Sequence, residues 1–319
     1  MKPNRHIATL IFAAVLFLVP LLVKNPYYLS ILVFIGIYSI TTMGLNLLMG
    51  YTGQISLGHA AFFGIGAYTT GILVKSGLSP AAAWSGLLLG GIAAMVVASV
   101  IGWICFRLRG PYFALSVLAL AEVLRLVALN WKELTNGAEG ILYIPAFTSK
   151  AAYYYIVLAI AAACFLAIRT VMRSRLGYYF LAIREDQDCA ESLGIDTTRY
   201  KLYSLLVSAF FTGVAGSFYM NYMGFIDPGI VFGIEHISIM MILVVMLGGA
   251  GTMWGPAVGA VIYILMSEAF RVFVKRGHLV FFGILIIVII IYFPNGIVGT
   301  LNEWRARRKP PGSPAPEGA

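Results

Sequence analysis

Glu122 and Arg125 lie three residues apart inside the apolar segment 112–130. Positions i and i+3 share one face of a helix, so the two side chains are predicted to pair. A lone charge near the centre of a membrane helix costs about 2.5–3.5 kcal/mol, which favours pairing and an inward orientation. Two roles are open for the pair. It contacts a charged substrate or couples its movement to an energy source, or it is a structural ion pair between helices or subunits.

A second polar group lies in the segment 44–71, GLNLLMGYTGQISLGHAAFFGIGAYTTG, which is unusually rich in glycine. Small residues allow helices to approach closely, and this explains some of the glycines. Asn46, Gln54, Ser56 and His59 add amides, a hydroxyl and an imidazole to the same segment. Polar groups at membrane depth face protein or a water-filled cavity. The segment is therefore predicted either to pack helices tightly or to line a transport pathway.

The sequence has none of the patterns expected of an enzyme. No Gly-Lys dipeptide is present, so the usual phosphate-binding loop is absent. The histidines are scattered without metal-ligand spacing, and Ser56 does not lie in a nucleophile elbow. We therefore predict no catalytic residue, no metal site and no nucleotide hydrolysis by this chain. Among the acids, only Glu122 lies well inside a predicted span, which argues against a proton relay.

Charged side chains are concentrated in residues 173–201, RSRLGYYFLAIREDQDCAESLGIDTTRYK, between two long apolar segments. Residues 178–193 contain neither Gly nor Pro and have a partial apolar stripe, so a short amphipathic helix is predicted there. Gly194 is expected to end this helix. A short helix at the membrane surface can pass force to the spans on either side. Alternatively, it is an interfacial connector without a partner.

Composition shows which solvent these elements occupy. Hydrophobic residues make up 60% of the chain and charged residues 11%, whereas a soluble domain averages about 25% charged. The fold class predicted is an all-α polytopic membrane protein with about ten spans, some broken or Gly-rich. Residues 50–58 and 248–256 are expected to be irregular backbone within the bilayer. The spans are predicted at 7–23 (retained, not a cleaved signal), 28–49, 55–74, 81–106, 112–130, 152–172, 201–223, 236–250, 254–272 and 279–293.

Lysine and arginine indicate the orientation. They are more abundant in the segments that lie on the same side as the N-terminus, which places both termini and residues 173–201 in the cytoplasm. The net charge of +9 reflects this bias, and no nucleic-acid-binding motif accompanies it. Two regions follow: a transmembrane domain, 1–301, with the charged segment 173–201 as a cytoplasmic loop, and a Pro-rich cytoplasmic tail, 302–319, predicted to be disordered. The longest outside loop, 131–151, is a connector or a docking surface for an external partner.

Three motifs resemble one known family. They are GLNLLMGYTGQISLGHAAFFGIGAY, GYYFLAIREDQDCAESLGIDTTRYKLYSLLVSAFFTGVAGSFY, and MLGGAGTMWGPAVGA with FPNGIVG near the end. The chain resembles the LivM-like permease subunits of bacterial ABC importers for branched-chain amino acids over most of residues 28–300. The resemblance implies two halves of inverted topology and a place in the bacterial inner membrane. It also implies a second homologous permease, two cytoplasmic ATP-binding subunits and an extracytoplasmic substrate-binding protein.

The resemblance further assigns roles to residues. The helix that seats on an ATPase subunit is expected to include Ala182, Arg184, Glu185, Ala190 and Gly194. ATP would be bound by the partner subunits, so this chain itself is expected to hold no cofactor. The family commonly reads Arg-Glu-Asn-Glu where this chain reads Arg184-Glu185-Asp186-Gln187, which leaves the identity of the ATPase partner open.

Three hypotheses follow for the function. The first is a permease subunit of an ATP-driven importer for branched-chain or related small amino acids. The second is a stand-alone ion-coupled secondary amino acid transporter, against which the shortage of acids within the spans argues. The third is a membrane scaffold for a cytoplasmic partner, against which the polar, Gly-rich spans argue.

Overall fold

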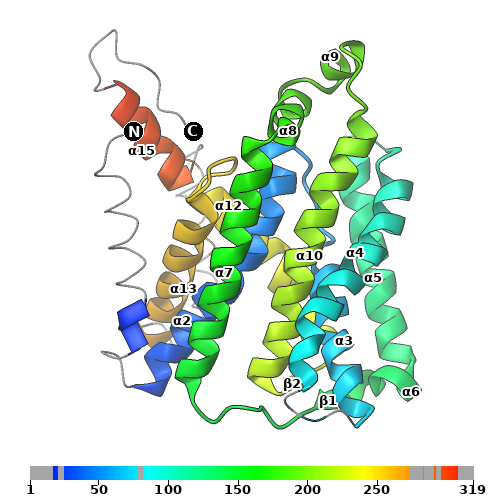
Figure 1. Cartoon of the computed structure of the whole chain (residues 1–319), viewed down its shortest axis with the longest axis vertical. Coiled ribbons are helices and arrows are strands. Elements are labelled where there is room, and N and C mark those ends of the chain that lie inside the picture. The colour runs from blue at the N-terminus through cyan, green and yellow to red at the C-terminus, as the bar shows by residue number, and fades with distance from the viewer. Residues whose placement is uncertain are drawn as a thin grey trace.

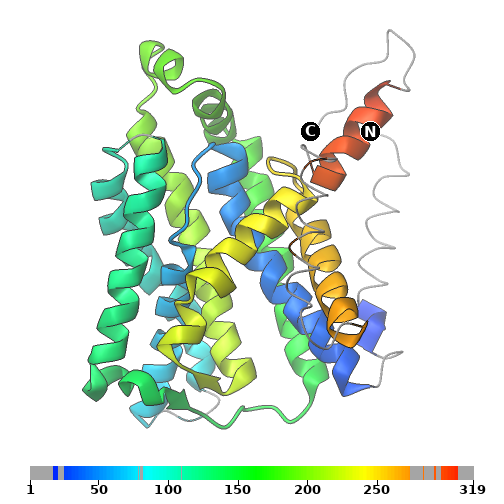
Figure 2. The ribbon, with the colours of Figure 1, turned by 180° about the vertical axis from the view of Figure 1, so that it is seen from behind.

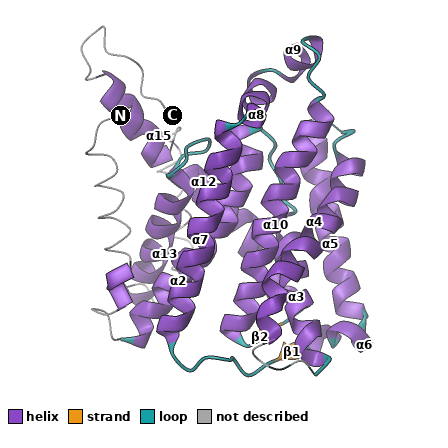
Figure 3. Ribbon diagram, in the orientation of Figure 1, coloured by secondary structure: helices purple, strands orange, loops and turns teal. Residues whose placement is uncertain are grey.

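The computed structural model describes residues 17–20, 25–77, 79, 82–108, 110–273, 283, 291 and 296–307. Helices make up nearly all of this part of the chain (Figure 3). A short antiparallel pairing joins β1 (Ile141–Leu142) to β2 (Phe225–Ile226), with Ile141 opposite Ile226. Lipid offers no partner to a free backbone group, so an apolar chain satisfies its backbone inside helices. The predicted all-α polytopic membrane protein is confirmed.

Within the described residues, six helical segments are long and apolar enough to cross a membrane. They are α2 (Pro26–Asn46) continued by the π-helix η1 (Leu47–Tyr51); η2 (Ala82–Ser85) with α4 (Gly86–Cys105); α5 (Pro111–Asn130); α7 (Lys150–Arg173); α10 (Thr197–Met223); and α11 (Pro228–Val231), η4 (Ile234–Ile239) and α12 (Met240–Gly248), which together form the sixth. Two further apolar helices, α3 (His59–Lys75) and α13 (Gly255–Phe273), follow the Gly-rich segments.

The predicted spans between residues 28 and 272 each correspond to one of these helices. The start of the span predicted at 236–250 was wrong, because the helical segment already begins at Pro228. Asp227 caps that start: its side chain accepts hydrogen bonds from the N–H groups of Gly229 (2.7 Å) and Ile230 (3.0 Å). The predicted spans 7–23 and 279–293 lie largely outside the described residues. The two inverted halves stay a prediction.

Helices α2 and α10 form the centre of the fold, since 67% of the most apolar 18-residue stretch of each helical segment is buried inside the chain. In contrast, α5 and α7 lie at the outside, with 22% and 28% of their most apolar stretches buried. Helix α10 packs against α3 and α4 on one side and α2 on the other, while α2 also packs against α7 and α13 (Figure 1). The two central helices therefore join both groups of outer helices.

The two ends of the helical bundle differ in character. At one end, α8 (Arg175–Glu185) and α9 (Gln187–Ser192) project beyond the ends of α4 and α7 (Figure 1). At the other end, the 131–151 loop contains α6 (Lys132–Thr135), η3 (Gly137–Glu139) and β1, and β2 pairs with β1. The helix α15 (Gly296–Arg307) crosses the predicted domain boundary at 301, and residues 308–319 lie outside the described part of the chain.

Candidate functional site

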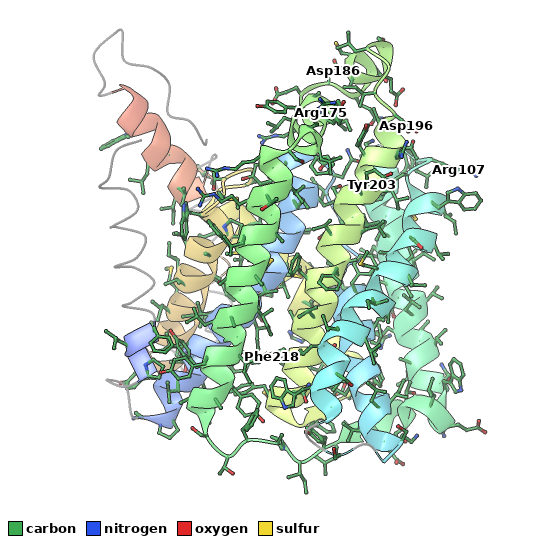
Figure 4. The ribbon with its side chains drawn as sticks, viewed as in Figure 1. Arg107, Arg175, Asp186, Asp196, Tyr203 and Phe218 are labelled. Carbon is green, nitrogen blue, oxygen red and sulfur yellow. The ribbon has the colours of Figure 1, made fainter. Side chains whose placement is uncertain are left out.

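The charged segment 173–201 forms two short helices. We predicted a single helix over 178–193, which was wrong: α8 ends at Glu185 and α9 begins at Gln187, with a break at Asp186. The backbone of Asp186 is extended, and its side chain accepts a hydrogen bond from the Cys189 N–H at 2.9 Å. An aspartate that caps the following turn competes with continuation of the preceding helix. Figure 4 shows Asp186 at this corner, with Arg175 at the start of α8.

Both helices have an inner, buried face. Phe180 and Ile183 of α8 and Ala190 of α9 are buried, while Ala182 is half-buried and Arg184 and Glu185 are exposed. Gly194 has φ +84° and follows the last turn of α9, so the predicted helix end at this residue is confirmed. Asp196 then caps α10 by accepting from the Arg199 N–H at 3.0 Å. The predicted coupling residues therefore share one compact corner, in which only some point away from the fold.

Arg184 connects α8 to both Gly-rich segments. Its Nη1 donates a hydrogen bond of 2.7 Å to the carbonyl oxygen of Gly50, at the π-helical end of α2. Gly53 and Gly251 also lie against Arg184, and a side chain on Gly251 would collide with the guanidinium group. The arginine predicted to contact an ATPase is thus hydrogen-bonded inward, to the backbone carbonyl at the end of α2, next to the two irregular segments.

Asn46, near the end of α2, joins the same two segments by side-chain hydrogen bonds to the backbone of the 249–254 segment. Its Oδ1 accepts from the Gly251 N–H at 2.8 Å, and its Nδ2 donates to the Thr252 carbonyl at 3.0 Å. Asn46 also lines a small crevice between α2, α7 and the start of α13, with Met43, Phe165, Ile168, Met253 and Pro256. Its role as a pathway residue stays a prediction. In the structure it satisfies the backbone of the irregular 249–254 segment.

Ser56 and His59, also predicted to line a pathway, are completely buried. His59 Nδ1 lies 2.9 Å from Ser56 Oγ, and Nε2 lies 2.7 Å from Ser208 Oγ of α10. Both ring nitrogens are therefore satisfied, and the imidazole fixes the start of α3 to α10. Gln54 lies half-buried in the irregular stretch between η1 and α3, where its N–H donates to the Leu48 carbonyl at 3.0 Å.

The predicted pair of Glu122 and Arg125 is formed within α5. Arg125 Nε donates to both carboxylate oxygens of Glu122, at 3.0 and 2.9 Å. The structure brings Asn46 and Arg184 to one site and Ser56 and His59 to another, while the α5 pair belongs to neither. Sequence reasoning missed Gly251, Thr252 and Ser208, because their partners are more than 100 residues away in the chain. Within the described residues, no group of His, Cys, Asp and Glu could hold a metal ion.

Lys201, another residue that the sequence did not single out, is buried at the start of α10 with 1% of its surface exposed. Its Nζ donates to Gln187 Oε1 of α9. Gln187 Nε2 in turn donates to Glu191 Oε1 at 2.9 Å, and Thr197 Oγ1 donates to the same oxygen at 2.6 Å. This network fixes α9 to the first turn of α10.

Lys201→Met is therefore expected to loosen α9. The substitution retains most of the buried volume but removes the donor to Gln187, and an unsatisfied buried group costs about 1–3 kcal/mol. Hydrogen–deuterium exchange of residues 186–196 should become at least about fivefold faster, the equivalent of 1 kcal/mol. Lys132→Met, at an exposed position at the opposite end, is the matched control. Unchanged exchange in α9 would contradict the role assigned to Lys201.

Comparison with known proteins places the chain in a family. A profile of the family described as "Branched-chain amino acid transport system / permease component" matches residues 27–290. The chain is 30% identical over 293 residues to the high-affinity branched-chain amino acid transport system permease protein LivM of Salmonella typhimurium, which covers 82% of this chain and 68% of that protein. LivM of Escherichia coli is 29% identical with the same coverage.

LivH of Salmonella typhimurium, a second permease protein of the high-affinity branched-chain amino acid transport system, is 25% identical over 289 residues, 82% of this chain and 91% of LivH. No solved structure matches the chain. The predicted resemblance to LivM-like permeases is confirmed. The chain therefore belongs to the family of branched-chain amino acid transport permeases and is a multi-pass membrane protein.

Proposed function

We propose that the chain is one of two permease subunits of an ATP-driven importer for branched-chain or related small amino acids in the bacterial inner membrane. Its proposed partners are a second homologous permease, two cytoplasmic ATP-binding subunits and an extracytoplasmic substrate-binding protein. Family membership supports the permease role. The observation that carries the ATP-driven mechanism is the projecting α8–α9 corner, which is bonded through Arg184 to the Gly-rich segments of the bundle.

The proposed coupling path begins at the exposed residues of α8. An ATP-binding subunit would dock on the α8–α9 corner and displace it when nucleotide closes the pair of ATPases. Arg184 would carry this displacement to Gly50, and Asn46 would carry it to the 249–254 segment. Irregular backbone and a π-helix are suited to this movement because they interrupt the regular hydrogen-bond ladder of the helices.

Energy enters this mechanism from other subunits. The chain lacks the usual phosphate-binding loop, so ATP would be bound and hydrolysed by the partners. The chain itself would supply the pathway wall and the docking corner. The network of Lys201, Gln187 and Glu191 would keep that corner rigid enough to transmit force.

Reconstitution tests the proposal. The chain and the subunits encoded beside it should be reconstituted together in proteoliposomes. Uptake of L-leucine should require ATP on the side of the membrane that carries the ATP-binding subunits, and the binding protein with L-leucine on the opposite side. The same vesicles with an ion gradient in place of ATP should show background uptake. Uptake by this chain alone, driven by an ion gradient, would instead establish a secondary transporter and contradict the ATP-driven proposal.

A further inference from the structure

The α5 ion pair lies on a surface that lipid cannot accommodate well. Glu122 and Arg125 lie in the middle of α5, whose most apolar window has a mean hydropathy of 2.0. Their side chains nevertheless keep 38% and 29% of their surface exposed in the folded chain. Charged groups at membrane depth normally face a bundle interior or water. This part of the chain surface is therefore expected to face something other than acyl chains.

Helix geometry shows which side of α5 carries the pair. Phe113, Val117, Ala121 and Ala128 form its buried stripe. Leu120 lies on one flank of this stripe and packs on the cluster that includes Ala94 and Ala98 of α4. At 3.6 residues per turn, Glu122 and Arg125 lie on the opposite flank, away from α4. The exposed Leu115 and Leu126 are neighbours of Glu122 on the side of α5 opposite the buried stripe.

A neighbouring element adds two more ionisable side chains. The π-helix η4 and the short α11 contact α5, and Figure 2 shows α5 beside the yellow 228–248 segment on the rear face. Glu235 and His236 of η4 are both exposed, although η4 belongs to a segment long and apolar enough to cross a membrane. π-Helical turns occur frequently at functional sites. We call a set of exposed or partly exposed side chains on these two elements the α5–η4 face. It combines charged and apolar groups, which complement the charged ends and the apolar side chain of an aliphatic amino acid. Its members are Leu115, Glu122, Arg125, Leu126, Glu235 and His236.

We propose that the α5–η4 face is a substrate-binding wall of the pathway, where Arg125 binds the carboxylate of an aliphatic zwitterionic amino acid and Glu122 or Glu235 binds its ammonium group. This inference rests on the proposed importer and adds to it a location for substrate binding within the chain. Without substrate, Glu122 and Arg125 neutralise each other. With substrate, each exchanges its partner for the group of opposite charge on the amino acid, and the planar guanidinium matches the carboxylate in two-point contact. Leu115 and Leu126 offer apolar surface to the aliphatic side chain.

Transport by the reconstituted complex with L-leucine gives the first test. Arg125→Gln is expected to lower uptake at least about tenfold, since it removes the charged partner of the carboxylate. The exchange E122R/R125E keeps an ion pair on α5 but places the positive charge at 122 and the negative charge at 125. The exchange variant should assemble normally and transport as poorly as Arg125→Gln. Transport at the parent rate by the exchange variant would show a purely structural pair and overturn the proposal.

Water accessibility gives a second test, which needs no transport. In a Cys189→Ser background, where Cys105 and Cys164 are buried, Glu122→Cys and Glu235→Cys should react with a membrane-impermeant charged thiol reagent in the assembled complex. L-leucine should slow both reactions. Val127→Cys, 45% exposed on the opposite flank of α5, is the control and should stay unreactive. Reaction at 122 and 235 no faster than at 127 would overturn the proposal, whereas ATP-driven uptake by the unmodified complex would still support the importer.

Discussion

Arg184→Met is expected to reduce ATP-driven uptake of L-leucine by about ten- to one-hundredfold while the ATP-binding subunits stay bound. Methionine keeps the aliphatic length of the side chain but cannot donate to the Gly50 carbonyl, which Arg184 Nη1 contacts at 2.7 Å. A hydrogen bond from a charged donor contributes about 1.5–3 kcal/mol, and 1.4 kcal/mol corresponds to a factor of ten. Co-purification of the ATPase, its hydrolysis rate and L-leucine uptake measure binding, turnover and coupling separately.

Glu185→Lys is the matched comparison on the same helix. Glu185 is exposed at the last turn of α8, where an ATP-binding subunit would dock in the proposed mechanism. Its charge reversal should weaken co-purification of that subunit, which Arg184→Met should not. If the two variants behave alike, the division between an inward anchor at 184 and an outward contact at 185 is wrong.

Gly251→Ala should reproduce the Arg184 defect without changing the arginine. A β-carbon at this position would collide with the guanidinium group, and the backbone φ of +75° also disfavours a side chain. Gly77→Ala separates the two causes, because Gly77 has a φ of +88° but no neighbouring atom within 4 Å of the place that a β-carbon would occupy. The control should therefore lose a little stability and keep full coupling.

The features that the sequence predicted correctly depend on local chemistry. The long apolar segments between residues 28 and 272 form the predicted helices, and Gly194 ends α9. Both could be predicted because the length and hydropathy of a segment, and the preference of glycine for a left-handed backbone, depend only on residues that are close in the sequence. The break at Asp186 was also local, but it was missed. Asp186 was counted as one more charge in an amphipathic helix, although aspartate is among the strongest caps for a following turn.

The candidate site could be predicted only in part, since its contacts join distant segments. Arg184 meets Gly50 across 134 positions, and His59 meets Ser208 across 149. Nothing in the residues around Ser208 marks it as a partner of an imidazole. Polar residues in one Gly-rich segment were predicted to line one pathway, whereas helix geometry turns Ser56 and His59 into the fold and Asn46 toward the 249–254 segment. Predicting those directions requires the packing of α2, α3 and α10.

Gly66→Leu is expected to prevent recovery of folded protein, the largest stability effect anticipated for a single substitution here. Gly66 of α3 lies against the backbone of Gly213 of α10, so a side chain would have to displace backbone and not a flexible neighbour. Ser217 Oγ also donates to the Gly66 carbonyl at 2.8 Å, which fixes the distance between the two helices. Overpacking of a well-packed core commonly costs about 1–3 kcal/mol, and a backbone collision lies at or above the upper end.

Size-exclusion chromatography and thermal unfolding in detergent measure this effect. Ala163→Leu, at an exposed position on α7, should elute and unfold like the parent. A folded Gly66→Leu chain with the parent's unfolding temperature would show that α3 and α10 can separate at little cost. Small residues let membrane helices approach closely and gain van der Waals contacts, because lipid removes the hydrophobic drive for helix association. The glycines of α3 and α10 therefore stabilise the helix pair that holds His59 in place, and α10 in turn supports the α8–α9 corner.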